Sequence, residues 1–71
     1  MEHYRNLGGD SGVSAYEIGS DYIRVRFSTG AVYSYSSRKA GSGHVEQMKM
    51  LAQRGHGLNS YINKYVKYSY D

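Results

Sequence analysis

The chain has 71 residues, and its nine Lys and Arg against six Asp and Glu leave a formal net charge of +3. A chain of this length forms one small domain and buries only about 60% of the surface that its unfolded form exposes. It contains no Cys, which excludes a disulfide framework and a thiolate zinc site. No apolar run approaches the ~20 residues of a membrane-spanning helix, and residues 1–9 lack the apolar core of a signal peptide. We therefore expect a cytoplasmic protein that has no membrane partner.

Tyrosine takes the place of aliphatic side chains in this composition. Leu, Ile, Val and Phe together number only twelve, whereas Tyr alone numbers nine. An aromatic ring buries ~150–250 Å², so tyrosine can supply the apolar area that the few aliphatic side chains cannot. With a net charge this low, we expect a folded domain that has tyrosines in its core.

The first half of the chain has the pattern of an antiparallel meander preceded by an arm. Residues 1–12 are polar and glycine-rich, so we expect a flexible N-terminal arm ahead of a single domain over residues 13–71. Alternating apolar residues predict strands over 13–18, 22–27 and 31–36. Short turns that contain Gly and Ser separate these strands and favour hairpin connections between them.

The two faces of the second strand differ in chemistry. Alternation places three apolar residues on one face, namely Ile23, Val25 and Phe27. It places a tyrosine and two arginines on the other face, namely Tyr22, Arg24 and Arg26. For the third strand two registers stay open. Either Ala31, Tyr33 and Tyr35 or, alternatively, Val32 and Ser34 share the face of the arginines.

The second half of the chain has the pattern of two helices. Residues 44–53 carry apolar side chains on one side of a helix, and the glycines at 55 and 57 end that helix. From Leu58 to Val66 the apolar residues repeat at helical spacing, which predicts a second amphipathic helix. Alternation over 66–70 then predicts a short C-terminal strand. The expected fold is α+β, with a three-stranded antiparallel meander packed on two helices and this short C-terminal strand.

Several short motifs occur in an order that resembles a known family. Tyr-Ser-Tyr at residues 33–35 follows the hairpin, Gly55-x-x-Leu58-Asn59-x-x-Ile62 begins the second helix, and Tyr-x-x-Tyr occupies residues 65–68. From about residue 13 to residue 70 the chain resembles the KTSC domain, which is named for the C-terminus of certain lysyl-tRNA synthetases and also occurs as small stand-alone bacterial proteins. The resemblance implies a bacterial protein with a KTSC-like domain over 13–71, and RNA binding is the function proposed for that family.

The sequence carries little that indicates catalysis. Its three histidines are not paired at the spacing of metal ligands, and they are His3, His44 and His56. The tetrapeptide Gly-Asp-Ser-Gly at residues 9–12 matches the sequence around the nucleophile of trypsin-like proteases. A chain of this size lacks the scaffold that a catalytic triad needs, so we interpret the match as coincidence. We expect a protein that is not an enzyme and that uses no metal and no cofactor.

The turn between the two helices is a candidate anion site. Backbone N–H groups at the start of a helix can bind phosphate, and this turn offers Gly55, His56, Gly57 and Asn59. Every break between two helices needs such a turn, however, so a plain helix-breaking turn is the favoured interpretation.

Basic and aromatic residues provide the stronger functional signal. Bases stack on aromatic rings and Arg neutralises phosphate, so an exposed sheet face that combines the two is typical of a platform for single-stranded RNA. The candidate nucleic-acid-binding residues are Tyr22, Arg24, Arg26, Tyr33, Tyr35, Arg38 and Lys39. The competing interpretation places Tyr33 and Tyr35 in the core and leaves the two strand arginines on an ordinary solvated face.

The sequence therefore predicts a small non-enzymatic binding module with RNA as its partner, bound through a basic and aromatic sheet face. The alternative is a protein-protein interaction or adaptor module, such as a phage-related accessory protein. That module would contact a protein partner or a second copy of itself through an exposed strand edge. Tyrosine is enriched at protein interfaces, which suits the alternative as well.

Overall fold

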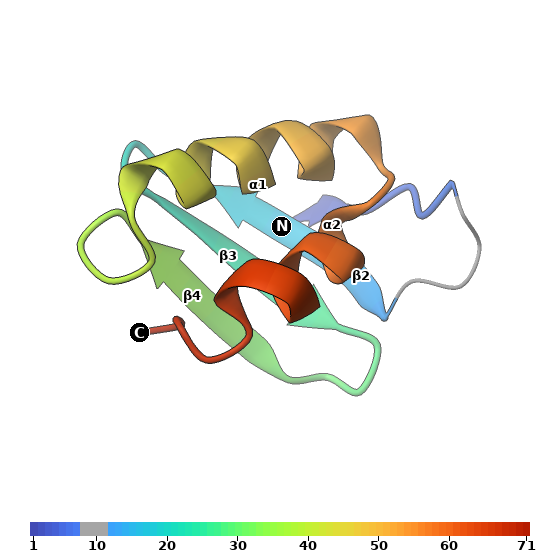
Figure 1. The fold of residues 1–71 in the computed structure, drawn as a ribbon. Coiled ribbons are helices and arrows are strands. Elements are labelled where there is room, and N and C mark those ends of the chain that lie inside the picture. The colour runs from blue at the N-terminus through green and yellow to red at the C-terminus, as the bar shows by residue number, and fades with distance from the viewer. Residues whose placement is uncertain (8–11) are drawn as a thin grey trace.

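The computed structural model describes residues 1–7 and 12–71, and it arranges them as an antiparallel sheet with helices on one face (Figure 1). The strands are β1 (Glu2–His3), β2 (Val13–Ile18), β3 (Tyr22–Phe27) and β4 (Val32–Ser36), and they lie in the order β1-β2-β3-β4. Helix α1 spans Ser42–Arg54, helix α2 spans Leu58–Tyr61, and a π-helical turn, η1, continues over Ile62–Val66. The α+β architecture is thus confirmed. Within the described residues, no helix has the length and apolar character needed to span a membrane.

The pairing of β3 with β4 decides which side chains share a face. Ile23 lies opposite Tyr35, and Arg24 lies opposite Ser34. Paired residues of antiparallel strands project to the same side of a sheet, so Tyr35 faces the helices together with Ile23. Of the two registers left open by the sequence, the structure has the one that places Val32 and Ser34 beside the arginines.

The core lies between the sheet and the helices and includes tyrosine, as the composition predicts. Tyr35 is only 1% exposed and belongs to the buried cluster. The sheet contributes Val13, Ile23, Val25 and Tyr35 to this core, α1 contributes Val45, Met48 and Ala52, and the last helical segments contribute Leu58, Ile62 and Val66. Strand β3 and the helical segments therefore bury most of the apolar side chains that their periodicity indicates. Tyr65 is the exception, since it occupies an apolar position of the repeat over 58–66 and is 51% exposed.

The N-terminal residues are docked onto the domain, which differs from the expected flexible arm. Residues 2–3 form β1, and Tyr4 is only 1% exposed. The Tyr4 backbone N–H donates to the Ser14 carbonyl at 3.0 Å, and the Leu58 N–H donates to the Tyr4 hydroxyl at 3.2 Å. This docking depends on contacts with residues far along the chain, so local glycine content does not indicate it. Residues 8–11, and with them most of the Gly-Asp-Ser-Gly tetrapeptide, lie outside the described part.

The C-terminal strand expected over residues 66–70 is replaced by other structure. The helical path continues through η1 to Val66, which is buried, and a turn follows. Val66 fits both a helical and an alternating pattern, and burial against the core favours the helical one. The last residue still contacts β4, because the Asp71 N–H donates to the Ser34 carbonyl at 2.7 Å. The fourth strand of the sheet comes from the N-terminus instead.

Replacement of Tyr4 by Phe tests the docking of the N-terminus. The Tyr4→Phe change removes the hydroxyl that accepts the Leu58 N–H and leaves this buried donor without a partner, which costs ~1–3 kcal/mol. We expect this decrease in the free energy of unfolding in urea denaturation followed by circular dichroism. Tyr68→Phe, at a tyrosine that is 77% exposed, is the matched control and should leave stability unchanged. Equal stability of the two variants would contradict the assigned hydrogen bond.

A glycine pair tests how closely the N-terminal segment approaches α1. Gly55 ends α1 with φ of 74°, and a Cβ atom there would lie 2.7 Å from Arg5 Cβ. Gly30 has φ of 96°, and no atom of the described residues lies within 4 Å of such a Cβ. Gly30→Ala should therefore lower the free energy of unfolding by only the ~1–2 kcal/mol that a left-handed backbone conformation costs a residue with a side chain. Gly55→Ala should lower it further, because the new Cβ atom also clashes with Arg5. Thermal unfolding of both variants measures the difference, and a smaller cost at Gly55 would refute the close approach.

Candidate nucleic-acid interface

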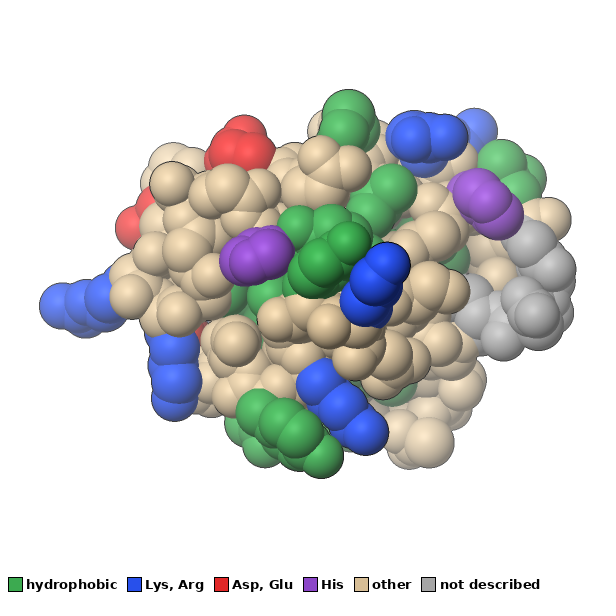
Figure 2. Space-filling view, in the orientation of Figure 1, with side chains coloured by type: hydrophobic (Ala, Val, Ile, Leu, Met, Phe, Trp, Pro, Cys, Tyr) green, Lys and Arg blue, Asp and Glu red, His purple; other side chains and the backbone are tan. Residues whose placement is uncertain are grey.

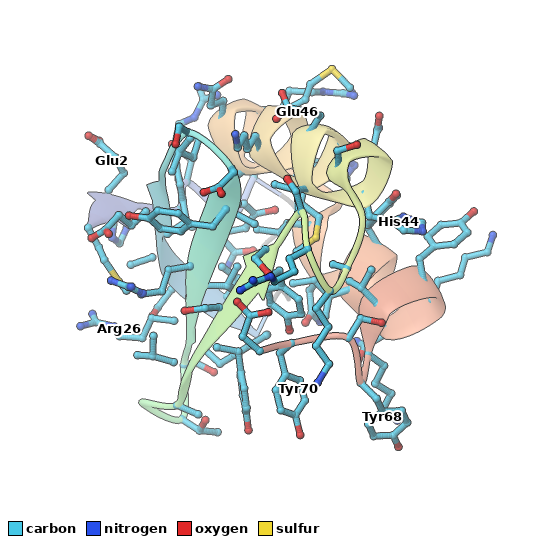
Figure 3. All side chains as sticks on the ribbon, turned by 90° about the vertical axis from the view of Figure 1, so that its left-hand side faces the viewer. Glu2, Arg26, His44, Glu46, Tyr68 and Tyr70 are labelled. Carbon is cyan, nitrogen blue, oxygen red and sulfur yellow. The ribbon has the colours of Figure 1, made fainter. Side chains whose placement is uncertain are left out.

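The outer face of the sheet holds the predicted group Tyr22, Arg24 and Arg26, but part of its charge is neutralised. Arg24 Nη1 lies 3.2 Å from Glu17 Oε2, and the Arg24 guanidinium carbon lies 5.5 Å from the centre of the Tyr22 ring. The Tyr22 hydroxyl donates to the same carboxylate at 3.1 Å. Arg26 donates to the neutral Ser14 hydroxyl at 3.4 Å and projects away from the sheet on the side opposite the helices (Figure 3). This face therefore combines a half-exposed ion pair with one outward-pointing cation.

Tyr33 and Tyr35 do not join that face, which corrects the predicted site. Their register partners are Val25 and Ile23, so both tyrosines lie on the helix side of β4. Tyr35 is buried there and is not accessible to a base, whereas Tyr33 is 37% exposed. The interpretation that places Tyr35 in the core is therefore correct, because the ring supplies apolar area that the core needs.

Arg38 and Lys39 lie apart from both groups. They are exposed in the loop between β4 and α1. The Ser37 N–H donates to the Asp21 carbonyl at 2.8 Å, which ties this loop to the turn between β2 and β3. The predicted set is thus spread over an outer face, an inner face and a loop.

The glycine turn at residues 55–57 has the geometry of a helix break. Gly55 and Gly57 have φ of 74° and 87°, values that side-chain-bearing residues rarely adopt. The first N–H group of α2, on Leu58, already donates to Tyr4, and α2 itself has only four residues. His56 is exposed, and Asn59 follows within α2. The arrangement supports the plain turn over an anion site.

A surface that the sequence reasoning did not assemble lies on η1 and the turn after it. Tyr65 is 51% exposed and Tyr68 is 77% exposed. Lys64 Nζ lies 5.3 Å from the centre of the Tyr65 ring, and Lys67 Nζ lies 5.5 Å from that of Tyr68. We call these four residues the tyrosine–lysine surface. Figure 2 shows this side of the molecule, where hydrophobic and Lys or Arg side chains gather over the C-terminal helical segment.

His44 and Tyr61 hold the Tyr65 ring in place. The His44 ring stacks on Tyr65 with centres 5.8 Å apart, and the Tyr61 and Tyr65 ring centres lie 4.7 Å apart. Burial, and then the neighbouring Tyr65, raise the pKa of Tyr61, so its hydroxyl keeps its proton. The Tyr61 hydroxyl and His44 Nδ1 share a hydrogen bond of 2.6 Å, in which the tautomer of the imidazole sets the donor. Tyr65 is therefore a half-exposed ring in contact with two neighbouring rings.

A groove, which we call the tail groove, lies between β4 and the C-terminal tail. It has a volume of about 280 Å³. Its aromatic lining is Phe27, Tyr33, Tyr35, Tyr68 and Tyr70, and its polar lining includes Asn63 and Lys67. The Tyr33 and Tyr70 ring centres are 4.7 Å apart with their planes at 48°, and Phe27 meets Tyr33 edge-on at 5.7 Å. The groove thus has aromatic walls with a cation among its lining residues.

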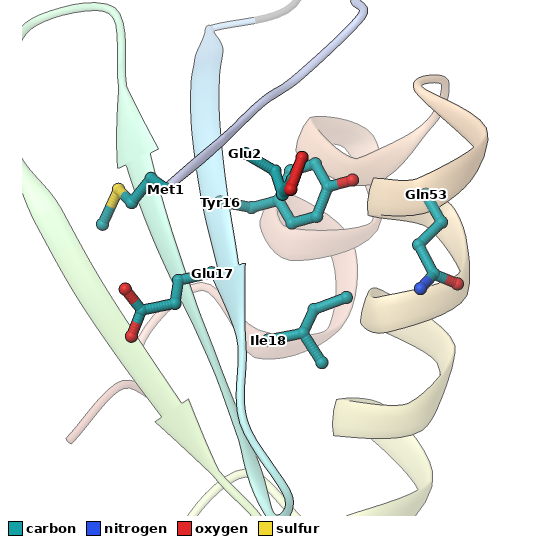
Figure 4. Close-up of a pocket in the computed structure, with 6 residues that line it drawn as sticks. All are labelled: Met1, Glu2, Tyr16, Glu17, Ile18 and Gln53. Atoms are coloured by element: carbon teal, nitrogen blue, oxygen red, sulfur yellow. The ribbon is translucent and has the colours of Figure 1, made fainter.

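A second hollow, of about 490 Å³, lies at the edge formed by β1, β2 and α1. Figure 4 shows Glu17 and Met1 on one side of β2, and Tyr16, Ile18 and Gln53 on the other. Glu17 already engages Arg24, while the other polar residues of the hollow, Glu2, Tyr16 and Gln53, lie on the helix side of β2. Within residues 1–7 and 12–71, no group of three or more His, Cys, Asp or Glu could hold a metal ion.

No family model, curated protein or solved structure matches this chain. The resemblance to the KTSC domain therefore rests on the sequence motifs and stays a prediction.

The titration of Tyr35 tests its placement beneath the tail. Burial, followed by the neighbouring Tyr33 and Tyr70, raises the pKa of Tyr35 from 10.0 to about 12. The folded protein then retains this proton while the unfolded chain loses it. The stability that the proton contributes should be complete below pH 10 and should decline as the pH rises towards 12. Tyrosine ring-carbon NMR shifts follow the ionisation of Tyr35, and ionisation near pH 10.0 would contradict its burial.

Proposed function

We propose that this chain is a small non-enzymatic module that binds single-stranded RNA and that the tyrosine–lysine surface is its main contact. One observation carries the proposal, namely that two exposed tyrosine rings each have a lysine ammonium within 5.5 Å of the ring centre. Proteins that bind single strands combine rings on which bases stack with cations that follow the backbone. The two tyrosines are three residues apart, as are the two lysines, and the first of each pair lies on η1 while the second lies in the turn that follows it.

The charge distribution supports this surface over the outer face of the sheet. Arg24 is paired with Glu17, and binding a phosphate there would compete with that pair. Lys64 and Lys67 instead contact aromatic rings, which attract a cation without neutralising its charge. Figure 2 shows further Lys or Arg side chains at the β4–α1 loop, which carries Arg38 and Lys39. A strand bound across η1 could reach these cations as well.

Salt dependence and charge-matched double variants test the proposal. Fluorescence anisotropy with a labelled oligouridylate of ~12 nucleotides, longer than most single-strand sites of one small domain, gives the affinity as a function of salt. The double variant Lys64→Gln/Lys67→Gln loses two phosphate contacts. The slope of the logarithm of the binding constant against the logarithm of the salt concentration should therefore become less steep by ~1.4. Arg24→Gln/Arg26→Gln removes the same formal charge from the outer face and should change the slope less.

Two results would refute the proposal. The first is the absence of binding to the parent protein at low salt. The second is a larger loss of affinity in the arginine variant than in the lysine variant, which would return the contact to the sheet face that the sequence predicts.

A protein-interaction module is the second candidate, and the edge of the sheet favours it. β4 ends the strand order, and a partner strand there would have to replace the hydrogen bond from the Asp71 N–H to the Ser34 carbonyl. An edge strand of this kind can accept a strand from a protein partner or from a second copy. Sedimentation velocity over a range of concentrations tests this candidate, since strand pairing produces a dimer that high salt does not dissociate. A monomer at every concentration would exclude self-association.

A further inference from the structure

The tail groove has the size and the lining of a site for one flat ring. Its volume of about 280 Å³ lies near the lower end of small-molecule sites, which begin at ~300 Å³, and this suits a single base with its attached groups. Tyr33 and Tyr70 are each 37% exposed, and their planes diverge by 48°. The two rings contact each other, and their exposed parts offer aromatic surface on which an aromatic occupant can stack.

The polar residues of the groove set the orientation in which a ligand would bind. Asn63 offers an amide that can both donate and accept hydrogen bonds, which is what the edge of a base requires. Lys67 supplies a cation, and its ammonium lies 5.5 Å from the centre of the Tyr68 ring. Asp71 is tied to the end of β4, because the Ser36 hydroxyl donates to Asp71 Oδ1 at 2.8 Å. Its negative charge disfavours a phosphate at that end, so the phosphate belongs beside Lys67.

We propose that the tail groove binds one unpaired nucleobase, stacked on Tyr33, Tyr68 or Tyr70, with its phosphate on Lys67. This inference rests on the proposed function and deepens it, since the tyrosine–lysine surface binds the strand and the groove accepts one of its bases. An aliphatic side chain from a protein would fill the aromatic walls but would leave Asn63 and Lys67 without partners. A base stacks on the aromatic residues of the groove and forms hydrogen bonds with Asn63, and its phosphate pairs with Lys67.

A mononucleotide separates the groove from the wider surface. Uridine 5′-monophosphate should bind with a Kd on the order of millimolar, because a single stacked base and one charge contact supply little binding energy. We expect it to shift the tyrosine ring resonances of Tyr33, Tyr68 and Tyr70 in NMR spectra. Inorganic phosphate at the same concentration should leave those ring resonances in place. Equal shifts from phosphate would overturn the proposal in favour of an anion contact on Lys67.

The chain offers a matched control for each variant. Lys67 and Tyr68 line the groove, whereas Lys64 and Tyr65 form the same kind of contact outside it. Lys67→Gln and Tyr68→Leu should each weaken mononucleotide binding on the order of tenfold. Lys64→Gln and Tyr65→Leu should weaken the oligouridylate but not the mononucleotide. Four variants with equal effects on the mononucleotide would contradict a base site in the groove.

The oligonucleotide distinguishes failure of the groove from failure of the proposed function. The parent protein could bind oligouridylate and an abasic strand of the same length equally well. In that case the groove does not bind a base and this inference is wrong, but the proposed RNA-binding function is not contradicted. If the parent protein does not bind oligouridylate, the proposed function itself fails. Groove resonances that shift with protein concentration in the absence of nucleotide would identify a second copy of the chain as the occupant and would overturn the inference.

Discussion

The pairing of Ile23 with Tyr35 is the constraint on which the rest of this structure depends. It directs the Tyr35 ring into the core, where the ring supplies area that few aliphatic side chains are present to supply. A shift by one residue would turn every side chain of β4 to the opposite face and would bury Ser34 in place of Tyr35. The same pairing separates Tyr33 from the arginines of β3 and places it beneath the C-terminal tail. The register therefore decides both the core and the location of the candidate site.

The C-terminal helical segment divides its side chains between these two roles. Val66 and Ile62 face the core, whereas Tyr65 and Lys64 face outward. The wider π-helical turn at this point is a form that occurs often at functional sites, because it changes the direction in which side chains leave a helix. The tail that follows η1 contacts the half-exposed ring of Tyr33 and forms one wall of the tail groove.

Tyrosine serves two purposes in this protein, and its hydroxyl group explains why. Tyr4 is buried, yet its hydroxyl accepts the Leu58 N–H at the start of α2, so a helix end is satisfied inside the core. Tyr68 and Tyr65 are exposed, and each ring associates with a lysine instead. A ring with one polar atom tolerates both environments, which lets a chain with few aliphatic residues build a core and still present aromatic surface.

The sequence by itself determined the elements whose signal is local. Alternation in residues 22–27 specifies a strand with one apolar face, helical spacing from Leu58 specifies an amphipathic helix, and the glycines at 55 and 57 specify the break before it. Only the tertiary structure decided the register of β4, the docking of Tyr4 and the path of the tail. Each of these depends on contacts between residues far apart in the chain, and no periodicity within a short window contains that information. The spacing of residues 64–68 in the sequence already indicates that tyrosines and lysines lie close together in the tyrosine–lysine surface. Their exposure could not be predicted from the sequence, because it depends on which side of the helix meets the sheet.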